Sequence, residues 1–345
     1  MRVGSMFGSL MLAVLLQGGA AQAEDCGPLK QINAVDLVAA RPNRALIPVS
    51  INGIPKLFLF DTGGGVSQIS GAVAEELKLS TRDSAGTMLD LYGHASRKFA
   101  IVDKFAVGHQ GGENIRLAIH PNPDFGRGTQ YVGLFSPDLM GRYDVEIDFG
   151  TYKMNYFSSD HCPGRVVYWH PAALAVTPMT FHKTHIKLPV KIDGKEVTAE
   201  IDTGAPGTTM RADAAKRLFD IVPESPGNVP LNAQGMAAAF GRVFSTLDFE
   251  GVAVQNPHIV IIPQLIGSKD PNNSARTDSR ARRVDDVEDQ PDVLIGMDIL
   301  KKLRLYIAFG ENKLYISEAS APPKQADISA PTTLEPSKAP VSPAQ

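Results

Sequence analysis

The sequence predicts a mostly β protein built from two similar lobes with short helices. Two observations carry this prediction. A strand–turn–strand pattern occurs twice, and each copy is followed further along the chain by one member of a second pair of matching segments. The chain has 345 residues, a length typical of about two domains, and 43 % of them are hydrophobic, which is enough for packed cores.

The first repeat is a hairpin that leads into an aspartate. When the chain is shifted by 141 positions, 48–53 lies over 189–194 without a gap. Each copy has an apolar strand, an Asn-Gly or Asp-Gly turn, and a second strand that ends at the aspartate. Such a strand delivers a carboxylate into a loop, which is one way to build a rigid site. The matching triplets are Asp61-Thr62-Gly63 and Asp202-Thr203-Gly204.

A second pair of segments matches at a shift of 160 positions, with 134–140 over 294–300. Each segment predicts a strand, a short helix, a strand, a turn and a strand. The second copy therefore carries 19 extra residues (160 − 141). The stretch 267–292 is polar and charged without hydrophobic periodicity, so we expect an inserted disordered loop there.

These repeats set the expected domain boundaries, with a first lobe at 24–160, a proline-containing linker at 161–183 and a second lobe at 184–318. His182 and His185 have a metal-like spacing, but no carboxylate or cysteine partner is evident nearby. We therefore expect a solvated linker there and no metal site.

The two ends of the chain predict export and disorder. Residues 1–23 resemble a secretory signal peptide, with a positive start, an apolar run and Ala21 and Ala23 before the cleavage site. The alternative is an uncleaved anchor, although the apolar run is short for a membrane span. We expect an exported protein, periplasmic or secreted, whose mature chain has no membrane span. Residues 319–345 predict a disordered tail.

Export places both cysteines in a compartment where they can be oxidised. Cys26 follows the cleavage site and Cys162 lies near mid-chain. A disulfide between them would join the mature N-terminus to the middle of the chain and restrict the unfolded state by roughly 4–5 kcal/mol. The alternative is two free thiols.

Composition excludes several functional classes. Charged residues make up 21 % of the chain and the formal net charge is −3, which argues against a strongly basic nucleic-acid binder and a wholly disordered chain. Two cysteines are too few for a cysteine-rich zinc module. The sequence also has no serine nucleophile elbow and no glycine-rich phosphate loop.

The duplicated triplets resemble those of the retropepsin-like aspartic proteases, here with both lobes in one chain as in pepsin. One Asp-Thr-Gly triplet is weak evidence, whereas two at equivalent points of a duplicated unit are specific. The resemblance covers most of 41–318 and includes Ser67 and Thr208, six residues after each aspartate. In that family a downstream glycine packs against the active-site loop. The second lobe has Gly296 there, whereas the first lobe has Ser136.

The resemblance implies an acid-protease fold with two six-stranded-type β lobes related by a pseudo-dyad, and it implies a mechanism. Asp61 and Asp202 would face each other and share one proton, because two close carboxylates cannot both ionise cheaply. The ionised aspartate would act as general base on a water and the protonated one as acid on the peptide carbonyl. The residues expected to support the two loops are Thr62, Gly63, Thr203 and Gly204.

Many pepsin-like lobes have a serine or threonine after the triplet, whereas this chain has Gly64 and Ala205. Loss of that hydroxyl donor raises a carboxyl pKa, so we expect a mildly acidic to neutral pH optimum. Flaps over the substrate are expected at Tyr92 and Gly93 in the first lobe and at Gly235 in the second. The alternative reading of the first flap is a surface turn with a packed tyrosine.

The sequence thus resembles a monomeric aspartic endopeptidase that acts on extended polypeptides and needs no metal or organic cofactor. One alternative is a non-catalytic peptide-binding protein on the same fold, motivated by Ser136 and the unusual flaps. A second alternative keeps the chemistry but pairs each lobe with its counterpart in another chain.

Overall fold

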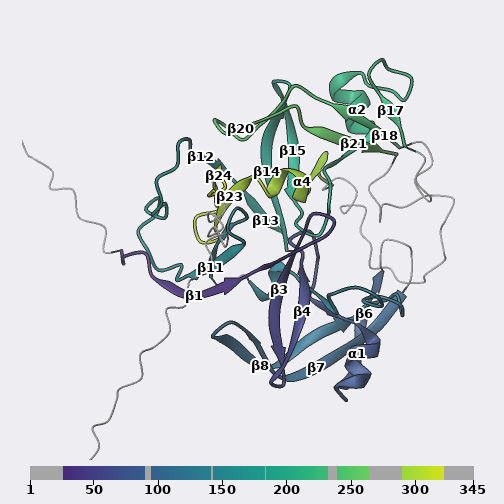
Figure 1. The fold of residues 1–345 in the computed structure, drawn as a ribbon, viewed down its shortest axis with the longest axis vertical. Helices are drawn as coiled ribbons and strands as arrows, with labels where there is room; N and C mark the ends of the chain where they lie inside the picture. The colour runs from purple at the N-terminus through teal and green to yellow at the C-terminus, as the bar shows by residue number, and fades with distance from the viewer. Residues whose placement is uncertain are drawn as a thin grey trace, which may run out of the picture.

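The computed structural model describes residues 26–89, 95–140, 143–182, 184–231, 239–263 and 290–321. The predicted signal peptide, all three flap candidates (Tyr92, Gly93 and Gly235), and nearly all of the predicted inserted loop and tail lie outside these residues. Within them the protein is mostly β, with two lobes joined by a shared sheet, which confirms the predicted fold class (Figure 1).

Lobe one, the purple and blue lower part of Figure 1, is built on an eight-stranded sheet. In spatial order its strands are β2 (Val38–Ala40), β3 (Arg44–Ile51), β4 (Ile54–Phe60), β9 (Gly133–Phe135), β5 (Gln68–Ile69), β8 (Gln110–Ile119), β7 (Ala95–Val107) and β6 (Ser80–Leu89). Its helical segments are α1 (Gly71–Glu76) and the 3₁₀ turn η1 (Pro137–Leu139).

Lobe two, the upper part of Figure 1, is built on a ten-stranded sheet. In spatial order its strands are β17 (Val229–Pro230), β18 (Phe240–Val243), β21 (His258–Ile262), β16 (Thr209–Arg211), β22 (Val293–Ile295), β15 (Lys195–Ile201), β14 (His185–Ile192), β19 (Thr246–Asp248) and β20 (Ala253–Gln255), with β13 (Thr180–His182) also pairing with β14. Its helices are α2 (Ala212–Phe219) and α4 (Met297–Leu300).

A six-stranded sheet joins the two lobes. Its strands, in spatial order, are β1 (Gln31–Asp36), β11 (Lys153–Phe157), β10 (Asp144–Asp148), β23 (Leu303–Ala308), β24 (Lys313–Glu318) and β12 (Ala175–Pro178). The last hairpin of each lobe leaves its own sheet, and β10 pairs with β23 at the centre of this one. The strands are therefore divided differently from the expected two six-stranded lobes.

The two predicted hairpins are present and have the same geometry. Asn52 and Gly53 have φ of 51° and 85°, and Asp193 and Gly194 have φ of 48° and 78°. Positive φ at both central residues is the type I′ turn that matches the twist of paired strands, and it favours these residue types. This turn fixes the register of β3 with β4 and of β14 with β15, and so fixes where each aspartate follows its strand.

The segment expected to be a linker contains two of these strands. β12 lies at the edge of the shared sheet beside β24, and β13 pairs with β14 of lobe two. Among the residues that the structure describes, no helix is long and apolar enough to cross a membrane.

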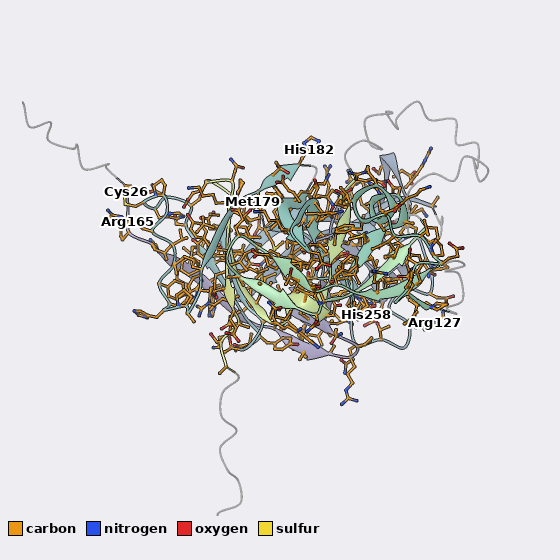
Figure 2. The ribbon with its side chains drawn as sticks, turned by 90° about the horizontal axis from the view of Figure 1, so that it is seen from above. Cys26, Arg127, Arg165, Met179, His182 and His258 are labelled. Carbon is orange, nitrogen blue, oxygen red and sulfur yellow. A yellow bond between two sulfur atoms is a disulfide. The ribbon has the colours of Figure 1, made fainter. Side chains whose placement is uncertain are left out.

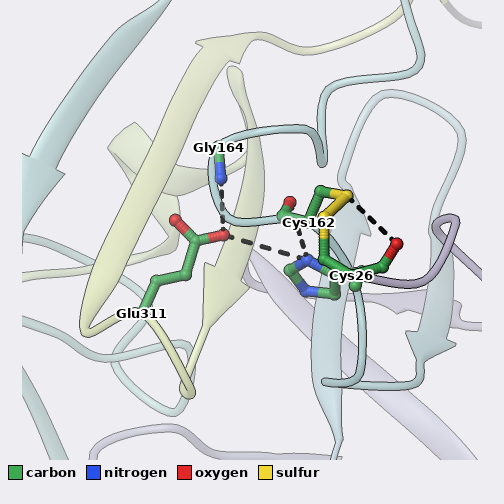
Figure 3. The surroundings of a disulfide bond; sticks show 5 residues. Cys26, Cys162, Gly164 and Glu311 are labelled. Atoms are coloured by element: carbon green, nitrogen blue, oxygen red, sulfur yellow. Dashed lines mark hydrogen bonds and ion pairs between the residues drawn. A yellow bond between two sulfur atoms is a disulfide. The ribbon is translucent and has the colours of Figure 1, made fainter. Parts of the chain in front are cut away.

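A disulfide joins Cys26, just before β1, to Cys162, just after β11, with a Cα–Cα distance of 4.8 Å. The N–H of Cys162 donates to the carbonyl oxygen of Gly27 (3.0 Å), so the two segments are also paired through the backbone. Glu311 accepts the N–H of Gly164 beside the bond (3.0 Å; Figure 3). In Figure 2, Cys26 and Arg127 lie at opposite ends of the molecule.

Candidate active site

The two aspartates occupy equivalent positions, each directly after a strand whose last three residues are buried. β4 runs parallel to β9 and β15 runs parallel to β22. The N–H of Asp61 donates to the carbonyl oxygen of Phe135 (2.9 Å), and that of Asp202 donates to Ile295 (3.0 Å). The downstream repeat therefore crosses behind each aspartate and holds its backbone in place.

Thr62 and Thr203 connect the two loops by four reciprocal hydrogen bonds. Each hydroxyl accepts the N–H of the opposite threonine, both at 3.0 Å. The Thr62 hydroxyl also donates to Ile201 O (2.7 Å), and the Thr203 hydroxyl donates to Phe60 O (2.8 Å). Both side chains are fully buried. The pseudo-dyad therefore passes between these two residues.

We expect Thr62→Val to destabilise the folded protein by roughly 2–6 kcal/mol, because two buried groups lose their partners at about 1–3 kcal/mol each. Valine keeps the shape of threonine but leaves the N–H of Thr203 and the carbonyl of Ile201 unpaired. Urea unfolding of the two proteins measures the difference. Thr62→Ser keeps the hydroxyl and is the control. An equal loss for serine and valine would contradict a hydrogen-bonding role.

The glycine of each triplet is required by the close approach of the loops. A methyl group on Gly63 would lie 2.5 Å from Asp202 Cγ and 2.8 Å from Asp202 Oδ2. A methyl group on Gly204 would overlap the Asp61 carboxyl group, at 2.6 Å from its Cγ, and lie 3.1 Å from Asp202 Oδ1. Each glycine thus leaves room for the carboxyl group of the opposite lobe.

The two carboxyl groups are hydrogen-bonded to each other. Burial and the charge of Asp202 raise the pKa of Asp61 well above the usual range of a carboxyl group. Burial and the charge of Glu200 raise the pKa of Asp202 by less. Backbone N–H groups stabilise the ionised form of both aspartates. Those of Gly204 (2.9 Å) and Ala205 (3.1 Å) donate to Asp202 Oδ1, and those of Gly63 and Gly64 bond to Asp61 in the same way. The pair therefore shares a single proton across the hydrogen bond between its two carboxyl groups.

A second hydrogen-bonding pair supports each loop from behind. The Ser67 hydroxyl donates to Asp138 Oδ1 (2.6 Å), and the Thr208 hydroxyl donates to Asp298 Oδ1 (2.7 Å). Both hydroxyls also accept a backbone N–H, from Ser136 (3.0 Å) and Gly296 (3.1 Å) respectively. Asp138 and Asp298 were missed in the sequence, although they lie over one another in the second repeat, so the duplication itself could have identified them.

Two departures from the family pattern compensate for each other in lobe one. A methyl group on Gly64 would overlap the hydroxyl of buried Ser136. In lobe two the glycine is on the downstream segment instead. A methyl group on Gly296 would overlap Gly207 O and lie 3.0 Å from Ala205 O. Lobe one therefore has a glycine on the active-site loop and a side chain, that of Ser136, on the downstream segment. Lobe two has alanine on the loop, at Ala205, and glycine on the downstream segment.

Three cross-lobe contacts surround the loops. Asn43 Nδ2 donates to Pro206 O (3.2 Å), and in the equivalent contact the Thr184 hydroxyl donates to Gly65 O (2.7 Å). Arg44 Nη1 donates to Gly204 O (2.5 Å). The Gly204–Ala205 peptide unit thus accepts from Arg44 at one end and donates to Asp202 at the other.

His185 corrects an expectation, because it does not lie in a solvated linker. It begins β14, and its Nδ1 contacts Glu200 Oε1 on β15 at 2.7 Å. This partner lies 15 residues downstream on the adjacent strand, so it is a neighbour in space but not in sequence. Within the described parts of the chain, no group of three or more His, Cys, Asp or Glu side chains could hold a metal ion.

Each lobe contributes one Asp-Thr-Gly loop, and the two aspartates of these loops form a hydrogen-bonded pair where the lobes meet. This arrangement is the one that defines the fold of aspartic proteases. The family model described as aspartyl protease matches 47–136 and 188–299, which together are more than half of the chain. The chain therefore belongs to the aspartyl protease family, as the sequence resemblance predicted.

Among solved structures, a crystal structure of basic 7S globulin from soybean aligns with 85 % of this chain and 95 % of its own, at 9 % sequence identity and a TM-score of 0.48. At these values the likeness bears on no functional point. A comparison with curated protein sequences gave no significant match.

Proposed function

We propose that this protein is an exported aspartic endopeptidase that acts as a monomer, with Asp61 and Asp202 as its catalytic pair. The observation that carries the proposal is the hydrogen bond between two buried carboxyl groups delivered by different lobes, each also bonded to backbone N–H groups of its own loop. An acid and a base with a shared proton are what peptide hydrolysis through an activated water requires.

In the proposed reaction Asp202 takes a proton from a water molecule, and the water oxygen bonds to the peptide carbonyl carbon. Asp61 gives its proton to the carbonyl oxygen, which forms a neutral tetrahedral intermediate. As the C–N bond breaks, Asp202 returns its proton to the leaving nitrogen and Asp61 regains a proton from the oxygen. Both aspartates then have their starting charge, and the proposed reaction uses no cofactor.

The proposed substrate is an extended polypeptide that lies across the two aspartates between lobes 24–160 and 184–318 and pairs as an added strand. Residues 1–23 would direct export and be removed. The disulfide between Cys26 and Cys162 supports an oxidising compartment.

The test incubates the purified mature protein with an unfolded protein between about pH 3 and pH 8 and identifies products by mass spectrometry. We expect wild type to cleave at mildly acidic to neutral pH, and Asp61→Asn and Asp202→Asn each to abolish cleavage. Asp193→Asn is the control, because it makes the same change in an exposed turn where lobe one already has Asn52.

The outcomes separate the alternatives. Peptide binding by wild type without turnover at any pH would support the non-catalytic binder. Activity that returns when Asp61→Asn and Asp202→Asn are mixed would show that lobes of different chains share a site, and would contradict the monomer.

A further inference from the structure

Lobe two carries buried charges where lobe one is apolar. In lobe one, Leu46 faces Leu59 across the β3–β4 ladder, and both are buried. At the equivalent positions of lobe two, Lys187 faces Glu200 across β14 and β15, and they are only 8 % and 5 % exposed. The fold can therefore be built with leucines at these positions. Buried charges are costly, so their presence beside a catalytic residue calls for another explanation.

Glu200 lies near the end of β15, and Asp202 follows the strand directly. Alternate residues of an extended chain point to the same side, so the two side chains start from one face with their Cα atoms roughly 6.6 Å apart. On this face Glu196 and Thr198 are exposed, whereas Glu200 is buried where the strand reaches the other lobe. The charge of Glu200 therefore acts on Asp202 with little screening by water.

His185 is the ionisable partner of Glu200. Its Nδ1 lies 2.7 Å from Glu200 Oε1, and its side chain is about one-third exposed, so it can exchange protons with solvent. The hydrogen bond to Glu200 raises the pKa of His185, and the charge of Asp202 also raises it. At the equivalent position lobe one has Arg44, which is bonded instead to Gly204 O. The pair is thus present in one lobe only.

Three strands place residues directly opposite or beside His185 and Glu200. From β14, Lys187 stands opposite Glu200. From β13, His182 stands opposite His185 and is exposed. From β22, Leu294 stands beside Glu200 and is apolar.

We propose that Glu200, held by His185, is a positioning residue that sets the pH range in which Asp61 and Asp202 together hold one proton. This inference rests on the proposed function and deepens it by naming what regulates the catalytic pair. Two coupled carboxyl groups lose their protons in two steps, which would form the acid and alkaline limits of activity. A negative charge at Glu200 opposes both steps and moves both limits to higher pH.

The main test compares pH profiles of kcat/KM for wild type and Glu200→Gln. Glutamine keeps the shape and the acceptor for His185 and removes the charge. We expect both limits to move to lower pH by about one unit, so that the rate changes about tenfold on each limb. The control is Glu196→Gln, on the same face of the same strand but exposed, which should leave both limits in place.

A merely structural role for Glu200 predicts a different result. It would lower kcat/KM by the same factor at every pH, or lower the unfolding temperature with unchanged limits, and either result would overturn the proposal.

A second measurement does not depend on catalysis. NMR titration measures the pKa of the His185 imidazole directly. We expect this pKa to be lower in Glu200→Gln and also in Asp202→Asn, because each substitution removes a negative charge that stabilises the protonated imidazole, and electrostatic coupling between two groups acts equally in both directions. If wild type cleaves nothing at any pH, the proposed function fails, but a His185 shift in Asp202→Asn would still establish the electrostatic link. No shift in either variant would refute it.

Discussion

Gly204→Ala is expected to lower kcat/KM by about 10²-fold or more, although it adds a single methyl group to the chain. The methyl would overlap the carboxyl group of Asp61 and lie 3.1 Å from Asp202 Oδ1. Either Asp61 must turn away or the two loops must separate. Both movements break the hydrogen bond through which the pair shares its proton, so the acid and the base no longer act on one substrate.

Gly207→Ala is the matched control, because it makes the same change three residues further along the same loop. Nothing lies within 4 Å of a methyl group there, and the residue does not have a positive φ that would exclude alanine. We expect Gly207→Ala to keep near wild-type kcat/KM, measured with the same peptide substrate. Equal losses in the two variants would show that loop flexibility matters, and that the close approach of Gly204 does not.

The duplication explains why so much of the site could be predicted from the sequence. Two hairpins with type I′ turns at the same distance from an aspartate place Asp61 and Asp202 at equivalent strand ends, and the structure has both at those positions. Local residue patterns and their duplication were enough to predict these two strand ends. That the two loops meet, with a glycine and a threonine of each triplet supporting them, was implied by the resemblance to aspartic proteases.

Other features depend on contacts between residues far apart in sequence. The shared sheet pairs β10 with β23, and no local pattern indicates which sheet a hairpin will join. The compensation between Gly64 and Ser136 is visible only when the two segments are packed together. Glu200 and His185 have no duplicated counterpart, so the comparison of the two copies gave no signal for them.

Replacement of both cysteines by serine should lower the free energy of unfolding by roughly 4–5 kcal/mol, because the disulfide closes a loop with a sequence separation of 136. Without it the unfolded chain gains the freedom of that whole segment. Urea unfolding of Cys26→Ser/Cys162→Ser beside wild type measures the loss. Reduced wild type is the control and should match the serine variant. Equal stability of oxidised and reduced wild type would contradict the prediction.

Activity should respond very differently from stability in the same variant. The disulfide fixes β1 at the edge of the shared sheet, whereas Asp61 and Asp202 are held in place by Thr62 and Thr203 and by the strands of the two lobes. Below its unfolding transition the serine variant should therefore keep near wild-type kcat/KM. A loss of activity in the folded variant would mean that the shared sheet also sets the angle between the lobes, and hence the distance between the two aspartates.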